Sequence, residues 1–267
     1  MPARRLAAVA VTLLALFLPI LPSAQASVAV SRTALTTGGD VSWPNCPKGM
    51  GIASRPSQGL PMPVPSARFS IVGATNGPAF TKNPCLHSQV TWARARHLWL
   101  SAYSVVSYPT PYQLARYGGT GTYDHRLFRV GIAQARYTLT TLRAAGLRTR
   151  MVWVDVESVH GLPWAAAPAH NNALLAGVLA GYRAYHVRAG LYSYASAWKS
   201  ITGNRRILLP TWVPSGSSTR VSALARCSQR SFSGGRTYLG QWSDGVRDYD
   251  VLCPGIARYV PGLFVST

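Results

Sequence analysis

The sequence lacks the charge density and the repeats that are typical of a disordered protein. Charged residues make up only 13% of its 267 residues, while apolar residues make up 48%, so the chain has enough hydrophobic side chains to form a core. No internal repeat or low-complexity block interrupts it. The length suits one large α/β domain, because barrels of this size commonly form a single unit.

Negative charge is especially scarce. The chain has seven acidic and 27 basic residues, so its formal net charge is +20. Glu157 is its one glutamate. A basic surface of this size attracts polyanions, which include nucleic acid, anionic lipid and an anionic cell wall. No nucleic-acid-binding motif accompanies the charge, so we expect no nucleic-acid partner and favour the cell wall.

Long apolar runs are absent after the first 26 residues, which excludes a later membrane-spanning helix. Residues 1–26 have a basic start, an apolar stretch, and small residues at Ala24 and Ala26, which is the pattern of a cleaved signal peptide. An uncleaved anchor is the alternative, although Pro19 and Pro22 interrupt a run that is shorter than a membrane span. We therefore expect a secreted, extracellular protein without stable membrane insertion after cleavage.

Cysteine is also scarce. The four cysteines are Cys46, Cys85, Cys227 and Cys253. An even number in an exported chain favours two disulfides, and these separations do not resemble the close ligand pairs of a zinc site. Four cysteines allow three pairings, of which we expect Cys46 with Cys85 and Cys227 with Cys253, and we expect no metal.

Short apolar strands alternate with helical stretches after a flexible mature N-terminus at 27–37. This alternation implies parallel pairing and predicts an α/β fold, a TIM-like (β/α) barrel of the (β/α)5(β)3 kind, over residues 38–267. The expected strands are 38–43, 69–77, 98–106, 149–157, 188–196, 206–215 and 236–245. The expected helices are 89–97, 127–145, 171–187 and 197–203.

Six of the seven acidic residues lie on or just beyond these strands, where barrels of this kind carry their chemistry. Asp155 and Glu157 face the same side of one strand, because side chains alternate along it. Two carboxyl groups close together in a partly dry site raise the pKa of one of them, and the protonated one can serve as a general acid. The six are Asp40, Asp155, Glu157, Asp244, Asp248 and Asp250.

This arrangement suits glycoside hydrolysis, which needs an acid for the leaving oxygen and negative charge for an oxocarbenium-like transition state. Two alternatives stay open: ion pairs between arginines and the pair Asp155 and Glu157, and metal binding by the late aspartates. A serine nucleophile with His160 is disfavoured, because no G-x-S-x-G elbow accompanies Ser158 or Ser193.

Six short stretches extend this interpretation: "DVSWPNC", "FSIVGATNGPAFTKNPC", "WVDVES", "GLYSYASAWKSITG", "PTWVPS" and "LGQWSDGVRDYDVLC". Through them, over roughly residues 38–255, the chain resembles the family 25 glycoside hydrolases, which are secreted lysozyme-like N-acetylmuramidases. It resembles more closely still a group of exported actinobacterial glycoside-hydrolase-like proteins.

The resemblance implies roles for individual residues. Glu157 matches the general acid, Asp155 assists it, and Asp40 matches the first active-site aspartate. Asp248 is the expected fourth carboxylate, with Asp250 as its alternative. The further substrate-binding candidates are Tyr103, Tyr192, Trp212, Gln241, Trp242 and Asp250, with the aromatic rings stacking on sugars.

The chain also departs from the family pattern. The aromatic-histidine segment after the third strand is here "AYSVV", without histidine, and the loop from Cys46 to Ser66 differs from the usual one. The resemblance implies retention of configuration, with either the substrate's acetamido group or a carboxylate as the nucleophile, and the sequence does not choose between them.

These observations predict a monomeric, exported hydrolase of cell-wall glycan that cleaves β-1,4 bonds next to N-acetylmuramic acid in peptidoglycan. The resemblance implies no cofactor. The alternative is a catalytically inactive, basic wall-binding protein on the same fold, and specificity for another wall glycan is a third interpretation.

Overall fold

The computed structural model describes residues 36–159 and 161–266. The expected signal peptide, most of the expected flexible N-terminus and His160 lie outside these residues. The first strand begins at Thr37, one residue before the expected start of the barrel. Within the described residues, no helix combines the length and the apolar character that crossing a membrane requires.

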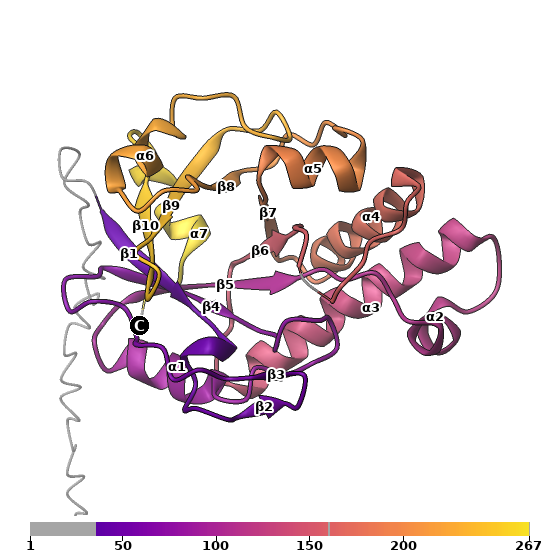
Figure 1. Ribbon diagram of the computed structural model, residues 1–267, viewed down its shortest axis with the longest axis horizontal. Coiled ribbons are helices and arrows are strands. Elements are labelled where there is room, and N and C mark those ends of the chain that lie inside the picture. Colours follow the sequence, from indigo (N-terminus) through magenta and orange to yellow (C-terminus); the bar gives the residue numbers. More distant parts are fainter. Residues whose placement is uncertain (1–35, 160, 267) are drawn as a thin grey trace, which may run out of the picture. The chain divides into compact units, whose positions relative to one another are not determined.

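Eight strands close into a barrel in the order β1-β10-β9-β8-β7-β6-β5-β4, which confirms the predicted α/β barrel (Figure 1). Pairing is parallel from β1 through β4 to β9, whereas β10 is antiparallel to both β9 and β1. The barrel therefore departs from an all-parallel TIM barrel. Its strands are β1 (Thr37–Val41), β4 (Phe69–Gly73), β5 (Trp99–Val105), β6 (Met151–Asp155), β7 (Arg188–Tyr192), β8 (Thr211–Pro214), β9 (Thr237–Ser243) and β10 (Asp248–Leu252).

Helices follow each strand from β4 to β8 and pack on the outside of the barrel. Between β1 and β4 there is instead a 3-10 turn, η1 (Trp43–Asn45), and a small hairpin of β2 (Gly51–Ile52) and β3 (Arg55–Pro56). The remaining elements are α1 (Leu86–Arg94), α2 (Pro111–Gly118), α3 (Tyr123–Ala144), α4 (Pro168–Ala184), α5 (Ala195–Thr202), α6 (Arg220–Ala225), η2 (Ala257–Tyr259) and α7 (Val260–Leu263).

Several of these elements were not expected from the sequence, among them helix α2 and strand β10. Helix α2 lies in a proline-rich stretch that reads as a turn, but Thr110 caps its first turn and Pro111 occupies the first helical position, where a missing N–H costs nothing. Strand β10 follows β9 after a tight turn and contains two aspartates, which are rare in strands.

Helices α3 and α4 lie side by side in close contact (Figure 1). A Cβ atom on Gly177 would lie 1.9 Å from the carbonyl oxygen of Phe128, and one on Gly131 would lie 2.2 Å from that of Leu174. Only glycine allows these backbones to approach so closely.

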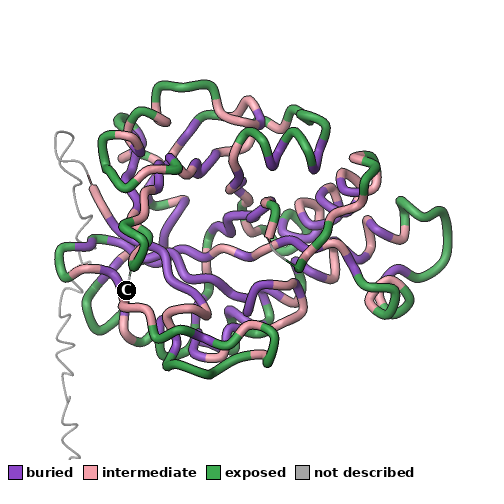
Figure 2. The backbone as a smooth tube through the Cα atoms, viewed as in Figure 1, coloured by how far each residue is buried: buried purple, intermediate pink, exposed green. Residues whose placement is uncertain are grey.

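The hydrophobic core has two parts, one on each side of the barrel wall. Side chains alternate along β6, so Val152 and Val154 pack among the surrounding helices while Met151 and Trp153 fill the barrel interior. Burial follows the strands and the inward faces of the helices (Figure 2). The same alternation places Asp155 above Trp153 at the end of the interior layer.

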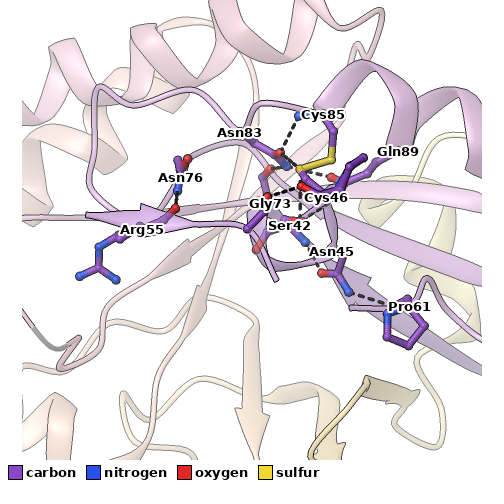
Figure 3. Close-up of a disulfide and its surroundings, with 12 residues drawn as sticks. Ser42, Asn45, Cys46, Arg55, Pro61, Gly73, Asn76, Asn83, Cys85 and Gln89 are labelled. Carbon is purple, nitrogen blue, oxygen red and sulfur yellow. Dashed lines mark hydrogen bonds between the residues drawn. A yellow bond between two sulfur atoms is a disulfide. The ribbon is translucent and has the colours of Figure 1, made fainter. Parts of the chain in front are cut away.

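Two disulfides form, Cys46–Cys85 and Cys227–Cys253, and both expected pairings are confirmed. Figure 3 shows the first, which joins the loop after β1 to the start of α1.

Beside it, the buried Asn83 side chain donates to the carbonyl oxygen of Gly73 and to Gln89 Oε1, each at 2.8 Å (Figure 3). Gln89 Nε2 donates in turn to the carbonyl oxygen of Ser42 at 2.7 Å. This network fixes the ends of β1 and β4 relative to α1.

Candidate active site

A small pocket of about 160 Å³ lies at the rim where the parallel strands end. All four acidic residues to which the sequence analysis gave a catalytic role line it, together with four of the substrate-binding candidates. The eight lining residues are Asp40, Tyr103, Asp155, Glu157, Tyr192, Trp212, Gln241 and Asp248.

Strand register brings these residues to one level. Asp155 of β6 pairs with Tyr192 of β7, and Tyr192 pairs with Trp212 of β8, so the three stand in one row across the barrel wall. On the other side, Asp40 of β1 pairs with Asp248 of β10. Because β10 runs antiparallel, its first residue meets the rim at which the parallel strands end.

Hydrogen bonds orient the polar wall of the pocket. The Tyr192 hydroxyl donates to Gln241 Oε1 at 2.8 Å, and Gln241 Nε2 donates to Asp40 Oδ1 at 2.8 Å. Because the Gln241 amide oxygen accepts from Tyr192, the amide nitrogen must face Asp40. Asp40 Oδ1 is therefore the acceptor in the bond to Gln241.

Glu157 lies two residues beyond the end of β6 and is half-buried. Burial, with a further contribution from the nearby charge of Asp248, raises the pKa of Glu157 to about 7. Its main-chain carbonyl accepts a hydrogen bond from Trp164 Nε1 at 2.9 Å, which holds the following loop against it. The Glu157 carboxyl group is therefore partly protonated near neutral pH.

Burial also raises the pKa of Asp155 and of Asp40 well above the ordinary aspartate value. The charge of Glu157 adds to the effect at Asp155, and the charge of Asp248 adds to it at Asp40. Asp155 Oδ1 is buried without a hydrogen-bond partner among the described residues. An unpartnered buried carboxylate is costly, so this group favours its neutral form.

Asp248 differs from the other three acidic residues because it is exposed at the barrel rim. Partial removal of water from its carboxyl group nevertheless raises the pKa of Asp248, while a hydrogen bond from Ser243 opposes the shift. Asp248 thus holds its negative charge more readily than the buried Asp40 and Asp155.

Two substrate-binding predictions need correction. Trp212 is only 1% exposed, because Tyr192 packs on it at 4.5 Å and Trp153 at 6.1 Å between ring centroids, so it has no open face for a sugar ring. Asp250 is fully buried below the pocket floor and accepts a hydrogen bond from Trp212 Nε1 at 2.7 Å. Both residues support the floor.

Trp242 lies outside this pocket. It lines a neighbouring one of about 390 Å³ that also includes Gln241, and its ring stacks on Tyr249 at 5.1 Å. Tyr103 and Tyr192 are the half-buried aromatic residues in the acidic pocket itself.

Neither alternative left open by the sequence has support among the described residues. Asp124 and His170 form the one ion pair among the described residues, so Asp155 and Glu157 are not paired with described arginines. Asp244 accepts hydrogen bonds from the backbone N–H groups of Val246 and Arg247 in the turn before β10, and it does not enter the pocket. In the described part of the chain, no cluster of three or more His, Cys, Asp or Glu side chains could hold a metal.

The serine interpretation has no support from the described residues. The buried Ser193 hydroxyl donates to the carbonyl oxygen of Val156, and Ser158 is exposed outside the acidic pocket.

Some structural residues of the site were missed. Trp153 stands two residues before Asp155 on the same face of β6, so strand alternation could have identified it as the floor. Asn171 bonds both the N–H and the carbonyl of Ala165 in the loop after Glu157, and no local pattern signals such a contact.

Part of the chain is similar in sequence to lysozyme-like proteins. A family model described as lysozyme-like protein 1 matches residues 125–214. Among curated proteins, lysozyme-like protein 5 of Caenorhabditis elegans is 30% identical over 70 residues, which cover 26% of this chain and 31% of the relative. The match thus spans about a third of that relative's length.

Solved structures extend the likeness over most of the chain. A bacterial lysozyme from Streptomyces coelicolor aligns with a TM-score of 0.57 and 16% identity, covering 86% of this chain and 98% of that one. A family GH25 lysozyme from Aspergillus fumigatus aligns with a TM-score of 0.54 and 16% identity, covering 86% and 99%. The chain has the fold of the family 25 lysozymes. The acidic pocket of this chain lies at the end of the barrel where the parallel strands finish, as the sequence predicted.

Proposed function

We propose that the protein hydrolyses a glycan of the cell wall, with Glu157 as the general acid. The observation that carries this proposal is a half-buried glutamate with a pKa of about 7 beside three other carboxyl groups in one pocket. A general acid works best when its pKa lies near the working pH, because it is then both protonated and able to release its proton. Glu157 donates this proton to the glycosidic oxygen that leaves.

Asp40, Asp155 and Asp248 stabilise the positive charge that develops on the sugar ring. Burial raises the pKa of Asp40 and of Asp155 and so suppresses their ionisation. A positive charge within a few ångströms of a carboxyl group favours its ionised form, so the oxocarbenium-like transition state is stabilised by carboxyl groups that have released their protons to solvent before the bond breaks. The carboxyl groups then interact more strongly with the transition state than with the neutral substrate, which is the requirement for catalysis.

The substrate proposal rests on the kinds of protein that share this fold and on the net charge of the chain. Lysozymes and a muramidase from Trichobolus zukalii share the fold, and the formal charge of +20 suits an anionic wall. We therefore propose β-1,4 bonds next to N-acetylmuramic acid in peptidoglycan as the target. Asp250 and Trp212 take a supporting role in this scheme, whereas Tyr103 and Tyr192 contact the substrate. The Tyr192 hydroxyl acts there as an acceptor, because it donates its proton to Gln241.

Product analysis tests the substrate and the chemistry together. The protein is incubated with purified peptidoglycan and with other defined wall glycans, and the soluble products are identified by mass spectrometry. We expect fragments with new reducing ends at N-acetylmuramic acid. Binding to peptidoglycan without release of any fragment would support the inactive wall-binding alternative, and cleavage of another glycan alone would overturn the assigned substrate.

A further inference from the structure

A second and larger pocket, of about 700 Å³, lies at the other end of the barrel, where strands β6 to β9 begin. This volume is within the range of pockets that hold small ligands in proteins. Met151 and Leu263 are buried at its lining, while Leu179, Val187 and Leu209 are half-buried around it. The pocket thus keeps an apolar wall next to open space.

Two tyrosines close one side of this pocket. The rings of Tyr238 and Tyr259 pack on each other with centroids 5.1 Å apart, and both residues line the pocket. Arg258 donates to the Tyr259 hydroxyl at 2.7 Å, which fixes that ring. The Tyr238 and Tyr259 rings therefore form a fixed wall of the pocket.

Cationic side chains stand at the mouth. Arg183, in the last turn of α4, and Arg188, at the start of β7, are both exposed and line the pocket, as does His186. None of the acidic residues in the described chain lines it, and the one described ion pair, Asp124–His170, involves none of these residues. The mouth therefore offers positive charge without a carboxylate to neutralise it.

An apolar cavity with an uncompensated cationic mouth complements a molecule with one apolar chain and one anionic end. We propose that this pocket binds a free long-chain fatty-acid carboxylate, with the chain against Leu179 and Leu209 and the carboxylate between Arg183 and Arg188. Guanidinium groups suit this end of the ligand because their planar donors match both carboxylate oxygens. The proposal does not depend on glycan hydrolysis, since the pocket shares no residue with the acidic one.

Methionine methyl groups provide a direct probe. With methyl-13C-methionine in the full chain, Met151 reports on this pocket, whereas Met50 and Met62 lie in the loop between β1 and β4 and serve as internal controls. Titration with dodecanoate below its micelle concentration should shift the Met151 signal saturably and leave the other two unchanged. Each pair of methylene groups added between octanoate and dodecanoate should tighten binding about tenfold, because each one is buried.

A charge variant tests the mouth. Arg183→Gln should weaken dodecanoate binding about tenfold by removing one ionic hydrogen bond. Arg136→Gln is the matched control, because Arg136 is exposed on α3 and does not line the pocket. An intact spectrum in both variants shows that the fold persists.

Several results would overturn the proposal. An equal shift of Met151 with dodecyltrimethylammonium would remove the role of the arginines. A shift produced only by anionic phospholipid vesicles would assign the face to a membrane surface. A shift that depends on protein concentration alone would assign it to a second copy of the chain, and no saturable shift would mean that no fatty acid binds.

Discussion

At the scale of single residues, the molecule concentrates its carboxyl groups in one place. Five of the seven acidic residues lie in the small pocket or directly below it, and only Asp124 and Asp244 lie elsewhere in the described chain. No described arginine neutralises Asp155 or Glu157. Burial and mutual repulsion therefore decide which of the carboxyl groups keeps its proton.

The pKa of Glu157 sets the pH dependence expected of catalysis. Because the general acid must be protonated, activity on peptidoglycan should fall as pH rises through about 7. The measurement is kcat/KM for release of reducing sugar across the pH range at constant ionic strength. The assignment would be contradicted if kcat/KM rose through pH 7. It would also be contradicted if the fall of kcat/KM at alkaline pH stayed the same when Glu157 is replaced.

The sequence predicted which acidic residues gather at the site but not how the residues beneath them pack. Strand alternation placed Asp155 and Glu157 on one face, and the resemblance added Asp40 and Asp248. The burial of Trp212 and Asp250 could not be predicted, because it depends on how Tyr192 and Trp153 pack across neighbouring strands.

At the scale of elements, the strands and main helices were predictable because apolar periodicity is strong along them. Strand β10 was not expected: its pairing with both β1 and β9 is a long-range feature that closes the barrel. The antiparallel direction of β10 is what brings Asp248 to the rim opposite Asp40. The local sequence of a strand does not show whether it pairs parallel or antiparallel with distant strands.

The contact between α3 and α4 gives an element-scale prediction. Gly177→Ala should lower the free energy of unfolding by about 1 to 3 kcal/mol, because the added methyl group would meet the Phe128 carbonyl and force the helices apart. Thermal denaturation followed by circular dichroism measures the change. Ala184→Ser, at an exposed position near the end of α4, is the control and should change the midpoint little.

An unchanged or raised midpoint in Gly177→Ala would mean that the two helices do not approach each other as closely as described. The same measurement on Gly131→Ala provides a second test of the interface, because its methyl group would meet the Leu174 carbonyl from the other helix.

At the scale of the whole molecule, the buried acidic pocket couples stability to pH. The folded chain holds protons on Asp40, Asp155 and Glu157 that the unfolded chain releases at ordinary aspartate and glutamate pKa values. The folded state binds more protons in this interval, so stability is greatest below the ordinary values near pH 4 and falls as pH rises, for Glu157 up to about 7.

The melting temperature should accordingly be higher at about pH 5 than at about pH 8. Asp155→Asn should reduce this difference in melting temperature, because it replaces a carboxyl group of raised pKa with a neutral side chain of similar size. Differential scanning calorimetry at matched ionic strength gives the comparison. A melting temperature that rises with pH in the wild type would show that the carboxyl groups are charged and compensated in the folded state.

The central claim is that Glu157 supplies the proton for glycan cleavage. The most direct measurement compares the wild type with Glu157→Gln and with Asp244→Asn, a control that removes an exposed carboxylate outside the pocket. Release of reducing sugar from purified peptidoglycan and binding to the same material are measured at the same mildly acidic pH. The account predicts that Glu157→Gln cleaves at least about a hundredfold more slowly while binding as well as the wild type. Asp244→Asn should keep both properties, and equal cleavage by the wild type and Glu157→Gln would contradict the account.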